Sequence, residues 1–301
     1  MKNYYELVDA NKQKSFLVIS FFILFISSSA YLIAKGFGFG LDFVGMALIF
    51  SGLASLGSYY FSDQMVIAMS GARKVTKKEF FIFYTVTENL AQAAQLPMPS
   101  IYVIDDTAMN AFATGRNPQH AAIVATTGIL ERLNRTELEG VIAHELSHVK
   151  NYDTLLMSLV TILVGVITLM ADWLLRWGGV GRRRNNDDRS DSQLQMILFI
   201  VGLILAILSP LVAQLIQLAI SRRREFLADA GSAAITKYPE GLAKALEKLR
   251  HDKEPLEAAN KATAHLYITN PLKNRSDSIG WFASLFNTHP PLEDRIKALR
   301  S

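Results

Sequence analysis

Four long apolar runs alternate with polar segments along this chain of 301 residues. They cover Phe16 to Ala34, Leu41 to about Phe61, Thr154 to Trp177 and Leu194 to Ile220. A helix needs about 20 apolar residues to cross a hydrocarbon core of about 30 Å, and each run is about that long. A single run of this kind is compatible with a buried core helix, but four in one chain predict an integral membrane protein.

The polar segments divide the chain into membrane and soluble parts. We predict an N-terminal pair of transmembrane helices in residues 1–61 and the first half of a soluble domain in residues 62–153. A second transmembrane or re-entrant hairpin is expected in residues 154–220, with a polar loop over residues 178–193. Residues 221–301 then complete the soluble domain.

Within the soluble parts, the pattern predicts mostly helices and a small sheet. The expected helices are Lys77 to Gln95, Ile129 to Leu133, Arg135 to Asp153, Arg222 to Ala234, Pro239 to His251 and Pro291 to Leu299. Short β-rich runs cover Ile101 to Ile104 and Ala121 to Thr127. The predicted fold is a mainly α integral membrane protein with four hydrophobic helices and an α+β soluble domain.

Composition agrees with this fold and excludes several functions. The chain is 50% hydrophobic and 19% charged, with a mean hydropathy of +0.20, which is more apolar than an ordinary soluble enzyme. It has no cysteine, so disulfides, thiolate metal ligands and a cysteine nucleophile are excluded. The basic clusters lack interleaved aromatic residues and any known binding motif, so we expect no nucleic-acid partner.

Basic residues beside the apolar runs predict the orientation in the membrane. Clusters precede the first run and follow the second and the fourth: Lys2, Lys12 and Lys14; Arg73, Lys74, Lys77 and Lys78; Arg222, Arg223 and Arg224. We therefore expect a multi-pass protein whose N-terminus and soluble domain are cytoplasmic. The loop after the third run is also basic, with Arg182, Arg183, Arg184 and Arg189. Basic loops are normally cytoplasmic. The last two runs therefore either cross the membrane and carry this loop out against that rule, or form a hairpin that does not fully cross the membrane.

One polar motif carries the chemistry: His144-Glu145-Leu-Ser-His148. Residues four apart lie on one face of a helix, so the two imidazoles can bind one metal ion. Glu145 then lies beside the ion and can take a proton from water, which is the arrangement of zinc hydrolases. The alternative is an exposed helix with two surface histidines. The apolar flanks argue against it: Leu138, Val141, Ile142 and Val149.

A catalytic zinc ion usually has three protein ligands, and the motif supplies two. The motif helix ends about 8 Å before the third run begins, and Glu225 lies a similar distance beyond the fourth run. A helical hairpin returns its ends to one membrane face, so we predict Glu225 as the third ligand. Asp229 lies on the same helical face and can hold the other ring nitrogen of a ligand histidine. Alternatively, Glu225 pairs with neighbouring arginines and Asp229 faces solvent.

The chain resembles the HtpX-type membrane zinc metalloproteases, gluzincins that are related to the CAAX prenyl proteases. The resemblance covers nearly the whole chain. The matching segments are the His144 motif, Asp153, Glu225-Phe-Leu-Ala-Asp229, Asn110 to Gly115, Thr288-His289-Pro-Pro and Arg295. It implies a zincin-like catalytic domain that binds a single Zn²⁺ ion through His144, His148 and Glu225, with Glu145 as general base. Asp153 and Asp229 are then expected to support the ligands.

The resemblance also implies roles for residues away from the motif. An edge strand between the β-rich runs can pair with an extended substrate, and its residues are Asn110, Ala111, Phe112 and Ala113. The alternative is a plain loop. His289 is expected to donate a hydrogen bond to the oxyanion, and Arg295 to hold a carboxylate of the site. Alternatively, His289 and the prolines after it form only a rigid turn before the last helix.

The implied function is protein quality control in a stress response, in which misfolded membrane proteins are cut at the cytoplasmic face of a bacterial plasma membrane. The expected partners are membrane-protein substrates and the lipid bilayer. The chain has no Gly-x-x-x-x-Gly-Lys-Ser/Thr loop, so we expect no nucleotide. One alternative is a prenyl-protein protease, although four spans are few for its enclosed chamber. The other is a metal-binding chaperone or scaffold, in which Glu145 has no purpose.

Overall fold

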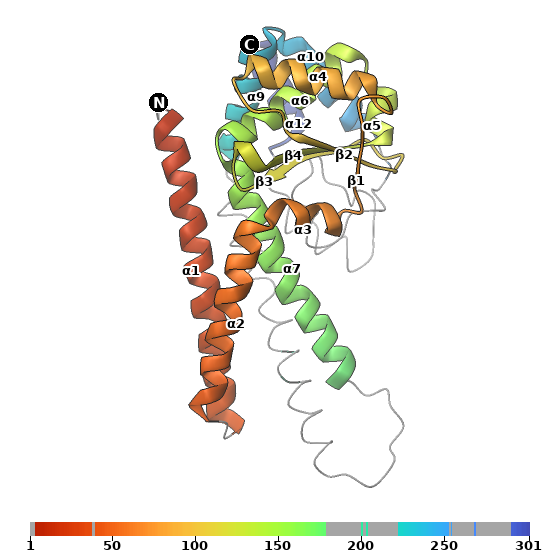
Figure 1. Ribbon diagram of the computed structural model, residues 1–301. Coiled ribbons are helices and arrows are strands. Elements are labelled where there is room, and N and C mark those ends of the chain that lie inside the picture. Colours follow the sequence, from red (N-terminus) through yellow and green to blue (C-terminus); the bar gives the residue numbers. More distant parts are fainter. Residues whose placement is uncertain are drawn as a thin grey trace.

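The computed structural model describes residues 4–37, 40–178, 222–252 and 290–301, together with residues 200, 203, 254 and 268. Its long helices project from one side of an α+β part, as Figure 1 shows. The helices are α1 (Tyr4–Phe37), α2 (Leu41–Tyr60), α3 (Ser62–Met69), α4 (Phe81–Ala93), α5 (Thr127–Arg132), α6 (Arg135–Lys150), α7 (Asp153–Gly178), α9 (Arg222–Thr236), α10 (Pro239–His251) and α12 (Leu292–Arg300). A short 3₁₀ helix, η1, covers Pro118–His120.

The first two predicted spans correspond to α1 and α2. Over Asp9–Tyr31 and Leu41–Tyr60, these helices are long and apolar enough to cross a membrane. They pack against each other, and the buried side of α2 carries serines, which permit close approach: Ser51, Ser55 and Ser58. Large apolar side chains face outward, including Phe16, Leu17, Leu24, Ile49 and Leu53. An apolar exterior of this kind is typical of lipid-facing helices.

The other two predicted spans are described less completely. The third run, Thr154 to Trp177, lies within α7, and its first part is buried in protein, with exposures of 3% or less at Leu155, Leu156, Leu159 and Val160. The fourth run and the polar loop lie outside the described residues, apart from Gly178, Ile200 and Leu203. Four membrane-crossing helices therefore stay a prediction.

The sheet is small and mixed. Its strands are β1 (Arg73–Lys74), β2 (Ser100–Ile104), β3 (Ala111–Gly115) and β4 (Ala121–Thr126), in the order β1-β2-β4-β3. β2 and β4, the two predicted β-rich runs, pair in parallel, whereas β1 and β3 are antiparallel to their neighbours. β3 is at the edge of the described sheet, so Ala111 to Ala113 form an edge strand and not a plain loop.

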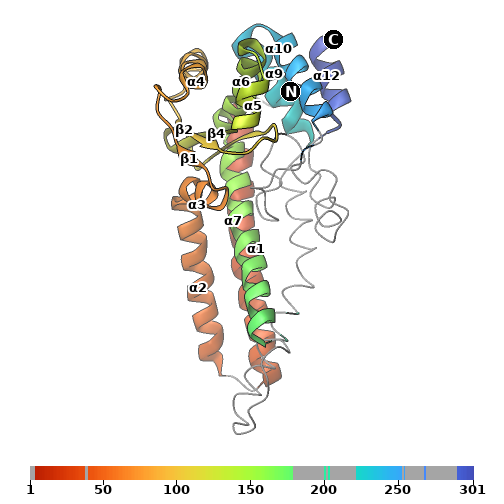
Figure 2. The same cartoon turned by 90° about the vertical axis from the view of Figure 1, so that its right-hand side faces the viewer.

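The sheet separates two apolar cores. Along β4, Ile123 and Ala125 belong to a core with α4, α6 and α10, whereas Val124 belongs to a core with α1 and α7. Both faces of β4 are covered, which explains why the strand is apolar throughout and not alternating. The consecutive helices α6 and α7 therefore lie on opposite sides of the sheet. Their junction is where the α+β part meets the long helices (Figure 2).

One predicted helix begins later than expected. The segment from Lys77 was predicted to be helical, but α4 begins at Phe81. The carboxylate of Glu79 accepts hydrogen bonds from the backbone N–H and the hydroxyl of Thr76, both at 2.8 Å. These local bonds hold the chain in a turn and compete with helix formation.

The motif helix also ends earlier than predicted. It was expected to reach Asp153, but α6 ends at Lys150. Tyr152 has a φ of +59°, a left-handed conformation that stops a helix. Asp153 therefore begins α7 and does not end α6, so its side chain can turn back toward the motif.

Close packing of α6 against α10 depends on Gly140. A Cβ atom at this position would lie 2.4 Å from the backbone nitrogen of Leu242. Gly140→Ala is therefore expected to destabilise the protein by about 1–3 kcal/mol, because the helices must move apart. Thermal unfolding of the detergent-purified protein measures the effect. Gly52→Ala, whose added Cβ meets no atom within 4 Å, is the control and should unfold like the parent. Equal unfolding temperatures for both variants would contradict the prediction.

Candidate active site

The motif helix α6 is capped at its start and buried along its length. Asn134 accepts a hydrogen bond from the N–H of Glu137, whose side chain accepts one from the N–H of Asn134. Of the two predicted start signals, Asn134 and Thr136, the first is the cap. His144 and His148 are only 1% and 5% exposed, so the alternative of two surface histidines is wrong.

His144, His148 and Glu225 converge on one point. The Nε2 atoms of the two histidines are 3.2 Å apart. The Glu225 carboxylate lies 3.7 Å from Nε2 of His144 and 3.5 Å from Nε2 of His148. One potential ligand atom from each residue lies within 4.8 Å of the others. The fold thus brings together the three ligands that were predicted from the sequence.

Small residues allow α9 to carry Glu225 close to α6. A Cβ atom on Gly231 would lie 2.4 Å from the hydroxyl of Ser147. One residue further along α9, the hydroxyl of Ser232 donates to a backbone carbonyl of α6 at 2.7 Å. At this crossing, Glu225 and Asp229 both face the motif helix, since residues four apart share one side of a helix.

The carboxylates behind the histidines make the cluster suitable for a cation. Nδ1 of His144 lies 3.0 Å from Asp229, and Nδ1 of His148 lies 3.0 Å from Asp153. When each Nδ1–H donates to its carboxylate, each Nε2 presents a lone pair to the shared centre. Two such nitrogens and the Glu225 carboxylate match the donors that zinc prefers. Asp229 is 2% exposed, so the alternative in which it faces solvent is wrong.

Arg295, on the C-terminal helix α12, is fully buried beside this cluster. It donates to Asp229 from Nε at 2.9 Å and from Nη2 at 2.7 Å. Its Nη1 lies 3.2 Å from the carboxylate of Glu225. Burial disfavours the charge of Arg295, but the two carboxylates outweigh this effect and raise its pKa. Arg295 therefore contacts two carboxylates of the cluster, as its predicted role requires.

The electrostatic environment favours a positive charge at the cluster. Burial lowers the pKa of His148, but a hydrogen bond to Asp153 and the charges of Glu225 and Glu145 raise it to about 9. Burial raises the pKa of Asp229, but His144 and Arg295 lower it below its usual value. Glu145 is 4% exposed and directly follows His144, the first predicted ligand.

Asp153 makes two contacts that sequence reasoning missed. Its Oδ1 atom accepts from the amide of Asn11 at 2.8 Å and from the guanidinium of Arg224 at 3.1 Å. In the sequence, Asn11 is only a polar residue near the first apolar run, and Arg224 belongs to a basic cluster that we interpreted as a topology signal. Neither position carries a local pattern that predicts a contact with Asp153.

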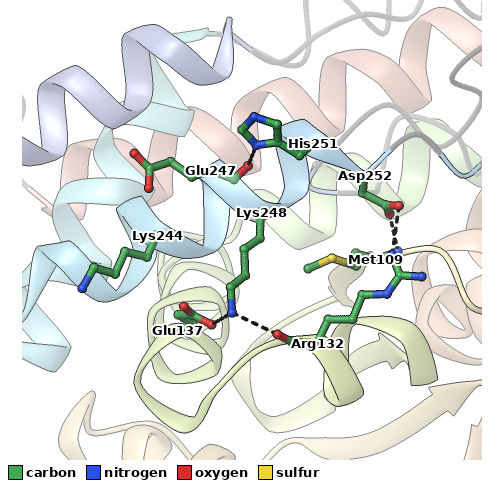
Figure 3. Close-up of a pocket in the computed structure, with 8 residues that line it drawn as sticks. All are labelled: Met109, Arg132, Glu137, Lys244, Glu247, Lys248, His251 and Asp252. Atoms are coloured by element: carbon green, nitrogen blue, oxygen red, sulfur yellow. Dashed lines mark hydrogen bonds and ion pairs between the residues drawn. The ribbon is translucent and has the colours of Figure 1, made fainter.

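The predicted substrate strand is fixed at its start by an ion pair. Asp252 accepts a hydrogen bond from the N–H of Met109 at 2.8 Å and pairs with Arg132 at 3.2 Å. Figure 3 shows these residues lining a cavity of about 740 Å³, where Lys248 also pairs with Glu137. Among the residues that the structure describes, the cavity lining contains no predicted ligand or catalytic residue. Its ion pairs instead fasten the two halves of the α+β part.

His289, the residue predicted to donate to the oxyanion, lies outside the described residues.

The cluster has the ligand set of a metallopeptidase, and comparison with known proteins agrees. The pattern of Peptidase family M48 matches residues 83–301. The chain belongs to peptidase family M48. A "Protease HtpX homolog" of Dictyoglomus thermophilum is 43% identical over 99% of this chain and 94% of its own length. The homolog of Streptococcus uberis is 42% identical over 98% and 99% of the two chains.

The family also defines the class of enzyme. This M48 member is a metallopeptidase of the HtpX type, as predicted, and the M48 family implies a bound metal. Among solved structures, the crystal structure of S. mikatae Ste24p is similar with a TM-score of 0.47 and 19% identity. That match covers 97% of this chain and 66% of the other.

Proposed function

We propose that this M48 peptidase is a zinc-dependent endopeptidase that cuts misfolded or damaged membrane proteins at the cytoplasmic face of a bacterial plasma membrane, without ATP. The main support is the buried convergence of His144, His148 and Glu225 beside Glu145. The cluster lies at the end of α6, next to the junction with the long helices. The cytoplasmic loops of a membrane-protein substrate can therefore reach the cluster while the spans of the substrate stay in the bilayer.

The proposed mechanism assigns a role to each residue of the cluster. His144, His148 and Glu225 would hold the metal. Bound zinc supplies Lewis acidity, which polarises the scissile carbonyl and makes water more acidic. Glu145 takes a proton from the attacking water and passes it to the leaving amine. Asp153 and Asp229 hold the ligand imidazoles in orientation, each at 3.0 Å, and Arg295 fixes Asp229 at 2.7 Å.

Substrate contacts complete the proposal. An extended substrate backbone pairs with the edge strand that begins after Asn110, at Ala111, Phe112 and Ala113, and replaces the hydrogen bond that the N–H of Ile268 donates to the carbonyl of Ala111. β3 packs against α6, which supports this role because the paired substrate then lies close to the motif helix. His289 donates a hydrogen bond to the oxyanion.

Casein degradation separates this function from its alternatives. The detergent-purified protein is expected to degrade casein with zinc, to stop when a chelator is added and to recover when zinc is restored. A prenyl-protein protease would instead cut a prenylated C-terminal peptide and spare casein. A metal-binding scaffold would bind zinc and cut neither substrate. Chelator-insensitive casein degradation would contradict the proposed mechanism.

The proposed orientation places residues 62–153 and 221–301 in the cytoplasm. The chain has no cysteine, so one introduced thiol reports its own position. Lys78→Cys and Lys237→Cys should resist a membrane-impermeant thiol reagent outside intact cells and react once the cells are opened. The positive control is a cysteine in an extracytoplasmic loop of another membrane protein, whose topology is known. Labelling of either variant in intact cells would overturn the orientation.

A further inference from the structure

A buried contact joins the first candidate span to the metal-ligand cluster. Asn11 is 5% exposed and lies near the start of the span Asp9–Tyr31. Its Nδ2 atom donates to Oδ1 of Asp153 and to the backbone carbonyl of Asn151, both at 2.8 Å. The other oxygen of Asp153 accepts from Nδ1 of His148 at 3.0 Å. Helix α1 is therefore one hydrogen-bonded residue away from a predicted metal ligand.

We propose that Asn11 is a positioning residue of the metal site, which orients His148 through Asp153. Helix α1 is then a working part of the peptidase site as well as a membrane anchor. The inference rests on the proposed role of His148 as a metal ligand. It adds a residue that lies more than a hundred positions from the motif in sequence and belongs to a different part of the fold.

The chemistry of the contact requires an amide. An asparagine nitrogen carries two hydrogens, and the two acceptors at 2.8 Å use both. The flipped amide would point its oxygen at two acceptors, so the contacts fix the orientation of Asn11. With Asn11 and Arg224 both donating to Oδ1, the Asp153 carboxylate cannot rotate freely, and Oδ2 stays directed at His148.

The surroundings of Asn11 hold α1 against the turn between α6 and α7. Lys12 lies 4.9 Å from the ring centroid of Tyr152, the residue with the left-handed conformation. A buried amide is stable at this position only with hydrogen-bond partners; one of its partners, Asn151, belongs to the turn, and the other, Asp153, begins α7. In Figures 1 and 2, the N-terminal end of α1 reaches the level of α6 and α9. A shift of α1 in the membrane would therefore act directly on Asp153.

Zinc release tests the proposal. Full-length protein carrying Glu145→Gln, which prevents self-cleavage, is purified in detergent, loaded with zinc and mixed with an excess of a chromogenic chelator. Asn11→Leu removes both donors and should release zinc about 10-fold faster, at the low end of the roughly 10–100-fold effect of partners that support ligand histidines. Asn11→Asp should release zinc faster still, because its charge repels Asp153.

Two controls separate positioning from general stability. Ser15→Ala lies one turn further along α1 and removes a bond that stays within that helix, so zinc release should match the parent. In an Asp153→Ala background, Asn11→Leu should add less than about twofold, because its effect passes through Asp153. A purely structural role would lower the unfolding temperature and accelerate zinc release equally in both backgrounds.

Each outcome decides the proposal. Zinc release from both Asn11 variants at the Ser15→Ala rate would overturn it, and so would an undiminished effect in the Asp153→Ala background. If Asp153→Ala cannot be purified, the unfolding temperatures of the Asn11 variants decide the matter. Faster zinc release at the parent's unfolding temperature supports the proposal, and faster release only with a lowered unfolding temperature overturns it. A parent protein that binds no zinc would overturn the proposed function and this inference together. A parent that holds zinc while the Asn11 variants behave like it would refute only the inference.

Discussion

The Glu145→Gln variant is expected to bind zinc like the parent while its peptidase turnover falls by about 10²-fold or more. The amide has nearly the same size as the carboxylate but cannot accept a proton at neutral pH. Glu145 is buried beside the ligands and is not itself one of the three converging groups, so the metal site should survive the change. Casein degradation measures turnover, and metal analysis of the purified protein measures zinc.

A second glutamine substitution on the same helix is the matched control. Glu139 pairs at 3.0 Å with Arg135, which lies one helical turn before it in α6. Both residues precede His144 and His148 on this helix. Because this pair is partly exposed, Glu139→Gln should retain nearly full activity and zinc. Full-length Glu145→Gln protein should also accumulate, since self-cleavage on solubilisation requires the base. Parent-like proteolysis by Glu145→Gln would end the mechanism proposed for Glu145.

The sequence predicted that His144, His148 and Glu225 lie together, and the structure shows this convergence, because the prediction needs only one local spacing and one topological rule. His144 and His148 share a helical face by spacing alone, and Glu225 was placed by the return of a helical hairpin. α10 begins and ends where the apolar periodicity predicted, at Pro239 and His251. Such features depend on residues within one or two turns of each other, or on one topological rule.

The elements that were missed have weak local patterns. β1 consists of Arg73 and Lys74, both exposed, so no apolar alternation indicates a strand. α3 follows α2 after a single residue, Phe61, whose φ of −111° and ψ of 21° break the helix without glycine or proline. Polar residues follow this break directly, at Ser62, Asp63 and Gln64, and the prediction therefore ended the span there without recognising a second helix.

The remaining parts of the site could not be predicted because they depend on long-range packing. Asn11 and Arg224 both contact Asp153, from segments that are far apart in the sequence. Their contacts depend on how α1 and α9 pack around the turn between α6 and α7. The turn itself requires Tyr152 to adopt a left-handed conformation. Nothing in the sequence indicates this conformation, since the residue is a tyrosine and not a glycine.

The Glu225→Ala variant is expected to lose most of its zinc together with its activity. Glu225 supplies the only carboxylate among the three converging ligands, and two imidazoles alone bind zinc weakly. Asp229→Ala should weaken zinc binding by about 10–100-fold, because the ligand His144 loses its support. Glu247→Ala, which removes an exposed pair with Arg300, is the control and should keep its zinc. Metal content and chelator competition on each purified variant measure these differences.

Glu225→Gln separates loss of a ligand from loss of stability. Glu225→Ala also leaves the buried guanidinium of Arg295 without one of its carboxylates, at 3.2 Å, so destabilisation alone could release the metal. The glutamine variant keeps the side-chain volume and an oxygen facing Arg295, yet a neutral amide is a poor zinc ligand. It should therefore unfold close to the parent temperature while its zinc content approaches that of Glu225→Ala. Full zinc occupancy in both variants would place the third ligand elsewhere, and His289 would become the next candidate.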